Sequence, residues 1–241
     1  PAMTPAPAAP AGGLLGDKPA GLTSHDVVDR LRRHLGIRKV GHAGTLDPAA
    51  TGLLVLLLGR ATKLSDQVMG ADKVYAGAFR LGETTNSHDA DGEVTARAEI
   101  PADLTLERLN ALAAGFLGDQ LQTPPMVSAV KVKGVPLYKL ARRGQEIERE
   151  PRLVHVYSFK FTRYEPPLAD FRLACTKGTY VRSIAHDLGQ RLGCGAHLFS
   201  LRRLASGPLR VEDATPLDSL LGDTPEALAA RIIPPARLVE T

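Results

Sequence analysis

Cysteine is scarce in this chain, whose 241 residues include only Cys175 and Cys194. Their separation of 19 positions matches none of the zinc-binding patterns, in which paired cysteines and histidines lie a few residues apart. A disulfide bond is not expected either, because such bonds are rare in reducing compartments. We interpret both residues as small, partly buried side chains and predict no metal site.

Long apolar runs are also missing. No run reaches the ~18–20 residues that a helix needs to span a bilayer. The stretch 1–12 is rich in proline and alanine, and it lacks the basic and then apolar segments of a secretory signal. We interpret 1–12 as a flexible lead-in, and we expect a cytoplasmic protein without a membrane partner.

Nucleotide-binding motifs and paired acids are absent as well. The segment "GHAGTLDPAATG" at 41–52 is rich in glycine, yet no G-K-[ST] follows and no strand leads a G-x-G-x-x-G into a helix. A nucleotide cofactor is therefore not expected. The same segment holds one carboxylate, Asp47, without a second acid nearby, which excludes the two-carboxylate arrangement of glycosidases. Any chemistry here uses Asp47 alone, as a nucleophile or a base.

The chain does have enough apolar sequence to form a core, since 44% of its residues are hydrophobic and 23% are charged. Its net charge is +4, which weakly indicates a polyanionic partner. Seven basic side chains against three acidic ones concentrate this surplus in segment 124–152. Either phosphate binding or an ordinary solvated loop explains the segment. Its basic residues are Lys131, Lys133, Lys139, Arg142, Arg143, Arg149 and Arg152.

Helices and strands are interspersed along the chain. Apolar spacing predicts a helix at 23–35, capped by Thr23 and Asp26, and a buried strand at 53–58. Segment 73–82 is apolar on both faces, which predicts a central strand. Without strict alternation of strand and helix, this order predicts an α+β fold with a mixed sheet flanked by helices. The other expected elements are helices at 105–117, 179–193 and 216–231 and strands at 126–132, 153–163, 170–176 and 197–204.

Four residues are candidates for chemistry or binding, each with a simpler explanation. Asp47 is held in a defined direction because it precedes Pro48, although Asp-Pro is also a common way to open a turn. Arg182 lies near a helix start, where it either orients a carboxylate or simply faces solvent. Tyr75 faces the core or a cleft, and the core is favoured. His42 follows Gly41, which favours exposure over burial.

Taken together, five blocks resemble the tRNA pseudouridine synthase B family. "GHAGTLDPAATGLLVLLLGRATKLS" is similar to its catalytic pattern G-H-x-G-x-L-D-P-x-A-x-G. The five blocks occur in family order and cover residues 14 to about 210. Their combination is specific, although each block alone is a weak signal. The other four blocks are "GLLGDKPAGLTSHDVV", "DKVYAGAFRLGETTNSHDADGE", "TPPMVSAVKVKGVPLYKLARRG" and "CTKGTYVRSIAHDLGQRLGCGAHLFSLRRLASG".

The resemblance implies a role for each matching residue. Asp47 is the expected catalytic aspartate, and Arg182 its salt-bridge partner. Tyr75 packs against the target base, and Leu201 completes an apolar wall. Three further residues are implied as neighbours: His42 stacks in the RNA, while Lys18 and Tyr180 support the site. The basic segment becomes an RNA-clasping insertion at about 124–152, with RNA contacts from Lys131, Lys133, Lys139, Arg142 and Arg143.

The implied activity is isomerisation of uridine 55 in the T loop of tRNA to pseudouridine. It needs base flipping and one aspartate but no cofactor. The resemblance further implies a mainly antiparallel sheet in a catalytic domain at 13–241, a monomer, and no guide RNA. Family members usually continue into a small C-terminal RNA-binding domain, which we expect to be absent because the sequence stops at Thr241. Two alternatives stay open, namely a guide-RNA-dependent relative and an RNA-binding module without catalysis.

Overall fold

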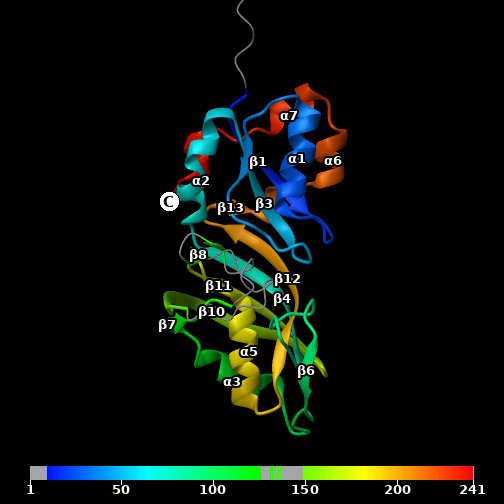
Figure 1. The fold of residues 1–241 in the computed structure, drawn as a ribbon, viewed down its shortest axis with the longest axis vertical. Helices are drawn as coiled ribbons and strands as arrows, with labels where there is room; N and C mark the ends of the chain where they lie inside the picture. Colours follow the sequence, from blue (N-terminus) through cyan, green and yellow to red (C-terminus); the bar gives the residue numbers. More distant parts are fainter. Residues whose placement is uncertain (1–9, 126–130, 133–134, 137–148, 241) are drawn as a thin grey trace, which may run out of the picture. The chain divides into compact units, whose positions relative to one another are not determined.

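The computed structural model of the chain describes residues 10–125, 131–132, 135–136 and 149–240 (Figure 1). It divides into two compact units. Unit 1 comprises 1–73 and 202–241, and unit 2 comprises 74–201. The chain passes between them within two strands, β4 (Lys73–Leu81) and β12 (Ala196–Ser206). None of the helices in the described part of the chain is both long and apolar enough to cross a membrane.

Unit 1 is built on a pair of antiparallel strands, β1 (Gly12–Lys18) and β3 (Thr51–Leu58). A short parallel strand, β14 (Thr215–Pro216), pairs with β1 on its other edge. The free edge of β3 is shared by two partners. Its end pairs with β2 (Val40–His42), and its beginning pairs in parallel with the part of β12 that starts at Arg202. The loop between β2 and β3 therefore leaves the sheet between these two partners.

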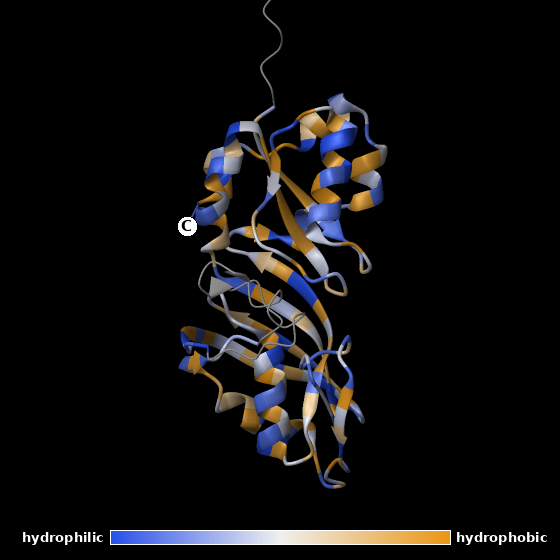
Figure 2. Cartoon of the chain, in the orientation of Figure 1, coloured by the Kyte–Doolittle hydropathy of each residue, from blue (hydrophilic) through white to orange (hydrophobic). Residues whose placement is uncertain are grey.

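The apolar run of β3 explains why this strand forms the core of unit 1. All six residues from Leu53 to Leu58 are fully buried, so both faces of the strand are covered. Helix α1 (Ser24–Leu35) buries Val27, Val28 and Leu31 and leaves its charged residues outward. In Figure 2, β3 is mostly orange while α1 is banded in blue and orange. Hydropathy thus separates a strand buried on two faces from a helix buried on one.

Short elements complete unit 1. After β3 come the 3₁₀ helix η1 (Gly59–Leu64) and α2 (Ser65–Met69). After β12, the strand β13 (Leu209–Arg210) pairs back onto it, and the 3₁₀ helix η2 (Val211–Asp213) leads to β14. The C-terminal helices are α6 (Leu217–Gly222), α7 (Pro225–Arg231) and α8 (Pro235–Leu238).

Unit 2 is a sheet with helices packed on it. Its strand order is β12, β4, β11 (Leu168–Cys175), β10 (Arg152–Glu165) and β7 (Gly118–Gln122). Helices α3 (Leu106–Ala114) and α5 (Val181–Leu192) lie side by side in this unit (Figure 1). Phe79 of β4 is the centre of an aromatic cluster with Phe159, Phe161 and Phe171. This cluster joins the sheet to both helices through buried residues of α3 and α5.

Two small hairpins stand apart from the large sheet. The first, β5 (Glu83–Thr85) with β6 (Val94–Arg97), belongs to unit 2 and encloses an Asp-rich turn. The second consists of β8 (Lys131–Val132) and β9 (Val135–Pro136).

Most of the expected elements are confirmed. Helix α1 begins one residue after Thr23, and the expected capping box between Thr23 and Asp26 is present in both directions. The predicted α+β class and the mixed, mainly antiparallel sheet are confirmed, and β4 is an interior strand as its apolar faces indicated. Strands β1 and β7 were missed. Most of the expected strand at 126–132 lies outside the described residues, as do residues 1–9 of the expected lead-in.

Candidate active site

Asp47 is exposed on the loop that connects β2 to β3. The loop around it is anchored from both sides. Leu46 is buried, and its backbone N–H donates to the hydroxyl of Ser24 at 2.9 Å while its carbonyl accepts from the same hydroxyl at 3.2 Å. The carbonyl of Pro48 accepts from the backbone N–H of Gly21 at 2.8 Å. The Asp47 carboxylate is therefore carried on a short, fixed backbone and is open to solvent.

Lys18 is the second anchor of this loop. Its side chain is 1% exposed, and its ammonium group donates to three carbonyls, those of Pro19 at 2.8 Å, Leu22 at 2.7 Å and Pro48 at 3.2 Å. Burial lowers the pKa of Lys18, and the negative charge of Asp47 partly opposes that change. The resemblance implied that Lys18 supports the site, and in unit 1 it ties the residue after Asp47 to β1.

Arg203 is the third anchor, and the sequence offered no signal for it. The side chain is 2% exposed, with Nε donating to the carbonyl of Leu53 and Nη2 to that of Gly44, both at 2.9 Å. At Gly52, where φ is +103°, a Cβ atom would lie 2.3 Å from the carbonyl oxygen of Arg203. A side chain at this position would force the loop away from β12, so glycine is required here.

His42 lies at the end of β2 and is half-buried, so the expectation of an exposed side chain is wrong. Its Nδ1 is buried and has no hydrogen-bond partner among the described residues. Burial lowers the pKa of His42, and the nearby positive charge of Arg203 lowers it further. The imidazole is consequently neutral at neutral pH. A neutral ring stacks on a base without the cost of desolvating a charge.

In unit 2, Tyr75 and Leu201 lie on neighbouring strands, β4 and β12. Both side chains are half-buried and pack against the same aromatic-rich core that contains Phe79. The strands come very close at this point, because a Cβ on Gly77 would lie 2.0 Å from the carbonyl oxygen of Ser200. The favoured interpretation of Tyr75 as a core residue is therefore half right, since one part of the ring stays accessible.

Arg182 is buried, with 8% of its surface exposed, so the simpler interpretation as a solvent-facing helix residue is wrong. It lies in the first turn of α5, whose N-terminal residue Tyr180 is fixed by Gln122. The Tyr180 N–H donates to Oε1 of Gln122 at 2.8 Å, and Nε2 of Gln122 donates to the Tyr180 carbonyl at 3.3 Å. The Arg182 guanidinium is also 5.8 Å from the centre of the Tyr180 ring. Gln122 thus fixes the backbone of Tyr180 at the start of the helix that carries Arg182, although Gln122 was not predicted as a site residue.

Asp89 is a further charged partner that the sequence analysis did not single out. Its Oδ2 lies 3.7 Å from Nη1 of Arg182. Its other oxygen accepts from the hydroxyl of Ser87 at 2.5 Å and from the N–H of Asp91 at 3.1 Å. A carboxylate held in this way fixes the guanidinium that it faces. The Asp-rich turn between β5 and β6 therefore belongs to the surroundings of Arg182.

The predicted site residues divide between the two units. Asp47, Lys18 and His42 belong to unit 1, whereas Tyr75, Tyr180, Arg182 and Leu201 belong to unit 2. The ion pair expected between Asp47 and Arg182 stays a prediction. Of the expected RNA contacts, Lys133, Lys139, Arg142 and Arg143 lie outside the described residues, and only the backbone of Lys131 is described.

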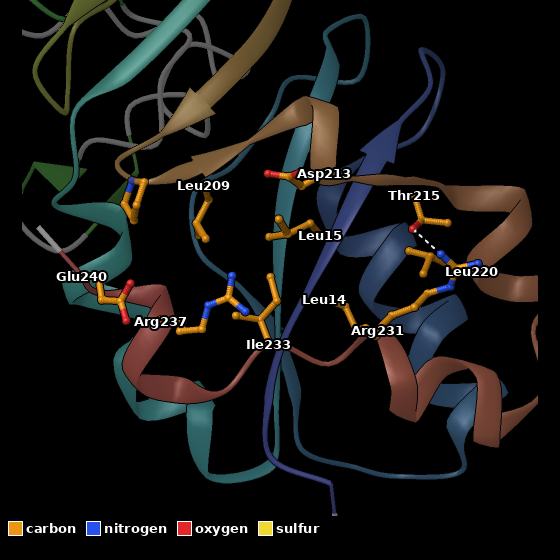
Figure 3. Close-up of a pocket in the computed structure, with 11 residues that line it drawn as sticks. Leu14, Leu15, Leu209, Asp213, Thr215, Leu220, Arg231, Ile233, Arg237 and Glu240 are labelled. Atoms are coloured by element: carbon orange, nitrogen blue, oxygen red, sulfur yellow. Dashed lines mark hydrogen bonds between the residues drawn. The ribbon is translucent and has the colours of Figure 1, made fainter.

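Metal-ligating side chains and cavities in the described part of the chain also bear on what the protein could bind. Among the described residues, no group of three or more histidine, cysteine or acidic side chains is arranged to hold a metal ion. A cavity of about 390 Å³ lies in unit 1 beside β1, between apolar side chains such as Leu15 and Ile233 and the arginines Arg231 and Arg237 (Figure 3). Arg231 is already engaged with Thr215 and Asp223. None of the predicted site residues lines this cavity.

Comparison with known proteins points to one family. Residues 32–181 match the domain described as "TruB family pseudouridylate synthase (N terminal domain)", and residues 182–239 match "tRNA pseudouridylate synthase B C-terminal domain". A protein of Opitutus terrae named tRNA pseudouridine synthase B is 56% identical over 223 residues, which cover 92% of each chain. A protein of the same name from Syntrophotalea carbinolica is 47% identical, over 89% of this chain and 70% of that protein.

Solved structures give a second comparison. A chain of a Cbf5-Nop10-Gar1 complex is similar with a TM-score of 0.74 and 30% identity, over 95% of this chain and 61% of that one. A chain of an H/ACA RNP bound to a substrate RNA containing 2'-deoxyuridine has a TM-score of 0.70 and 27% identity, over 95% and 60%. The chain thus spans about three fifths of these structural neighbours.

Proposed function

Since the chain belongs to the TruB family of pseudouridylate synthases, we propose that it converts uridine 55 in the T loop of tRNA to pseudouridine. The observation that carries this proposal is the anchored loop between β2 and β3 that presents Asp47, in a chain that is 56% identical to a tRNA pseudouridine synthase B over most of its length. The proposed chemistry follows from that loop.

The reaction rearranges one nucleotide without net addition or loss of atoms. The bond between N1 of uracil and C1′ of ribose breaks, C5 bonds to C1′ in its place, C5 gives up its hydrogen, and N1 gains one. Substrate and product are isomers, so no redox partner or energy source is needed. The base must first leave its loop, which costs a few kcal/mol and is easier in a loop than in a duplex.

Asp47 supplies the single carboxylate for this rearrangement. As a nucleophile it adds to the base or sugar, and as a base it removes a ribose proton. In either case the carboxylate must be ionised and aimed. The hydrogen bonds to Leu46 and Pro48 on each side support the aiming. For ionisation, we propose a salt bridge with Arg182, because a guanidinium favours the charged form of a carboxylate.

Unit 2 is proposed to receive the flipped base. Tyr75 stacks on the uracil ring, and Leu201 provides apolar contact from the neighbouring strand. The partial exposure of both side chains on a rigid core supports this role. Arg182 is then shared between Asp89, which it faces in unit 2, and Asp47. A guanidinium can serve both because it has five donors in a fixed plane.

Contacts with the rest of the tRNA are assigned to His42 and to the basic segment 124–152. His42 is proposed to stack on RNA in its neutral form. Lys131, Lys133, Lys139, Arg142 and Arg143 are proposed to neutralise phosphates, so binding should weaken with salt. Replacing Arg142 by alanine should weaken tRNA binding and reduce the slope of log K against log salt by about one. Filter binding at several salt concentrations measures this, and an unchanged slope would remove the clasp proposal.

The decisive experiment uses the purified chain alone with an unmodified tRNA transcript. Chemical mapping of pseudouridine should show one modified position in the T loop, and none in a transcript that carries cytidine there. The similarity to Cbf5 and H/ACA structures favours one alternative, a synthase that requires guide RNA. If the wild-type chain modifies nothing without a guide RNA but acts when one is added, the standalone proposal is wrong.

Two broader expectations accompany this proposal. We propose that the chain acts as a monomer, because a single chain carries every residue assigned above. We also propose that it acts in the cytoplasm, in keeping with a tRNA substrate. Sedimentation with and without tRNA measures the first, and fractionation of cells that express the chain measures the second.

A further inference from the structure

Two histidines from distant parts of unit 2 form a stacked pair. The rings of His88 and His186 are parallel to within 9°, with their centres 4.0 Å apart. His88 lies in the Asp-rich turn after β5, and His186 lies in the middle of α5. Nδ1 of each ring is buried and has no hydrogen-bond partner among the described residues. The two half-buried imidazoles contact each other through their faces.

The stack lies beside the contact between Asp89 and Arg182. His88 directly precedes Asp89 in the turn, and His186 follows Arg182 by four residues on α5, which places both on one face of the helix. The same turn and the same helix are thus joined twice, once by two rings and once by two charges. The two contacts lie one residue apart on the turn and four residues apart on the helix.

The backbone of His88 shows that the turn is held in a demanding conformation. Its φ is +65°, and it is the one residue other than glycine with a positive φ among the described residues. Its carbonyl accepts from the N–H of Leu198 in β12 at 2.9 Å, and the hydroxyl of Thr85 donates to the carbonyl of Asp89 at 2.6 Å. The side chain of His88 is therefore directed at α5 by a backbone that is fixed on both sides.

Burial and the surrounding charges favour a neutral His88 ring. Burial, the largest cause, lowers the pKa of His88 to about 4 together with charge repulsion from His186, Arg182 and Arg149, against an opposing effect of Asp89. His186 is next to Asp187, whose pKa is raised by burial. At neutral pH, His88 is uncharged. A proton on His88 would bring a second positive charge next to Arg182.

We propose that His88 and His186 are positioning residues for the reaction, which clamp the Asp89 turn to α5 and thereby hold Arg182 in place. They act only while the His88 ring is uncharged. This inference rests on the proposed function, because it assigns to Arg182 a part in pseudouridine formation. The proposed role of the histidine pair differs from simple core packing in one respect. The effect of the pair on the reaction rate is transmitted through Asp89.

The first test replaces each ring and measures single-turnover pseudouridine formation with saturating enzyme. His186→Ala should slow the reaction about tenfold, the upper end of what an aromatic pair contributes, while tRNA affinity stays within about twofold. His186→Phe keeps a ring without a proton and should restore most of the rate. His88→Asn tolerates the positive φ but loses the ring, so it should behave like His186→Ala. If His186→Ala and His88→Asn both react at the wild-type rate, the inference is wrong.

The second test asks whether the effect passes through Asp89. Asp89→Asn should slow the reaction, and adding His186→Ala to it should cause little further loss. A merely structural pair would instead give effects that multiply, because independent contributions to stability add. Thermal unfolding of each variant separates a slow enzyme from an unfolded one, and multiplying effects in folded variants would overturn the inference.

The third test is pH dependence. The ratio of the wild-type rate to the His88→Asn rate should be constant above about pH 6.5 and should fall toward pH 4, because only the wild type has the His88 ring to take up a proton beside Arg182. A constant ratio over this range would overturn the requirement for a neutral His88 ring. Failure of the proposed function is recognised separately, since the wild-type chain would then form no pseudouridine at any pH.

Discussion

The two units hold their key side chains by different means. In unit 1, Lys18, Ser24 and Arg203 bind the backbone of the loop that carries Asp47, and Asp47 itself stays exposed. In unit 2, Arg182 is buried and is held by side chains, with the carboxylate of Asp89 facing it. The proposed reactive carboxylate is positioned through its backbone, and the guanidinium proposed to orient it is positioned through its partners.

This difference has a chemical reason. A carboxylate that attacks or removes a proton must reach substrate, so its own oxygens cannot all be engaged. Rigidity then has to come from the backbone around it. A guanidinium that orients other groups works best with its donors occupied and water excluded. Substitutions at the two places should therefore fail in different ways, with loss of chemistry in one case and loss of structure in the other.

The largest effect is expected at the tip of the unit 1 loop. Asp47→Asn keeps the shape of an exposed side chain but removes the charge, so pseudouridine formation should drop by at least ~10³-fold while stability is unchanged. Single-turnover kinetics and denaturant unfolding measure the two quantities. Normal turnover in this variant would remove Asp47 from the mechanism. A large loss of stability would contradict the assignment of Asp47 as an exposed side chain that does not contribute to the stability of the fold.

The next effect concerns the anchors and is expected in stability. Arg203→Met leaves the carbonyls of Leu53 and Gly44 without their donor in a buried place, which should cost about 3 kcal/mol of unfolding free energy. Arg210→Met at an exposed position of β13 is the matched control and should change stability by less than about 0.5 kcal/mol. Equal effects of the two substitutions, measured by urea unfolding, would show that the anchors do not hold the loop.

Sequence patterns predicted those parts of unit 1 whose structure is determined by residues close together in the sequence. Thr23 and Asp26 are three residues apart and cap α1 by themselves, and the apolar run 53–58 indicates burial wherever the strand pairs. Strand β1 was missed because its three glycines and its Asp17 and Lys18 resemble a loop. At least one of these glycines is required by packing against a distant part of the chain. A Cβ on Gly13 would lie 2.5 Å from the side chain of Leu238, which comes from the other end of the chain.

For the site, the family pattern supplied the candidate reactive residues but not the residues that support them. Asp47, Tyr75 and Arg182 lie in motifs that can be recognised locally. Arg203 is 150 residues from the carbonyl of Leu53 that it binds, and nothing in its neighbours indicates burial. His88 and His186 likewise come from separate segments, and only the packing of α5 on the turn brings them together. Contacts of this kind follow from the fold, so no short pattern reports them.

The smallest effect expected is a pH dependence of stability from unit 2. Burial lowers the pKa of His88 from 6.5 to about 4, so the folded chain takes up this proton less readily than the unfolded chain. The stabilisation is complete above about pH 6.5 and is lost as the pH falls toward 4. The whole shift corresponds to about 3 kcal/mol, and we expect about 1 kcal/mol because solvent screens a half-buried ring. His88→Asn, which has no proton to gain, should flatten the urea-unfolding profile between these pH values. An unchanged profile would mean that the acid sensitivity of unit 2 comes from its carboxylates, and the neutral state of the ring would then contribute nothing to holding Arg182.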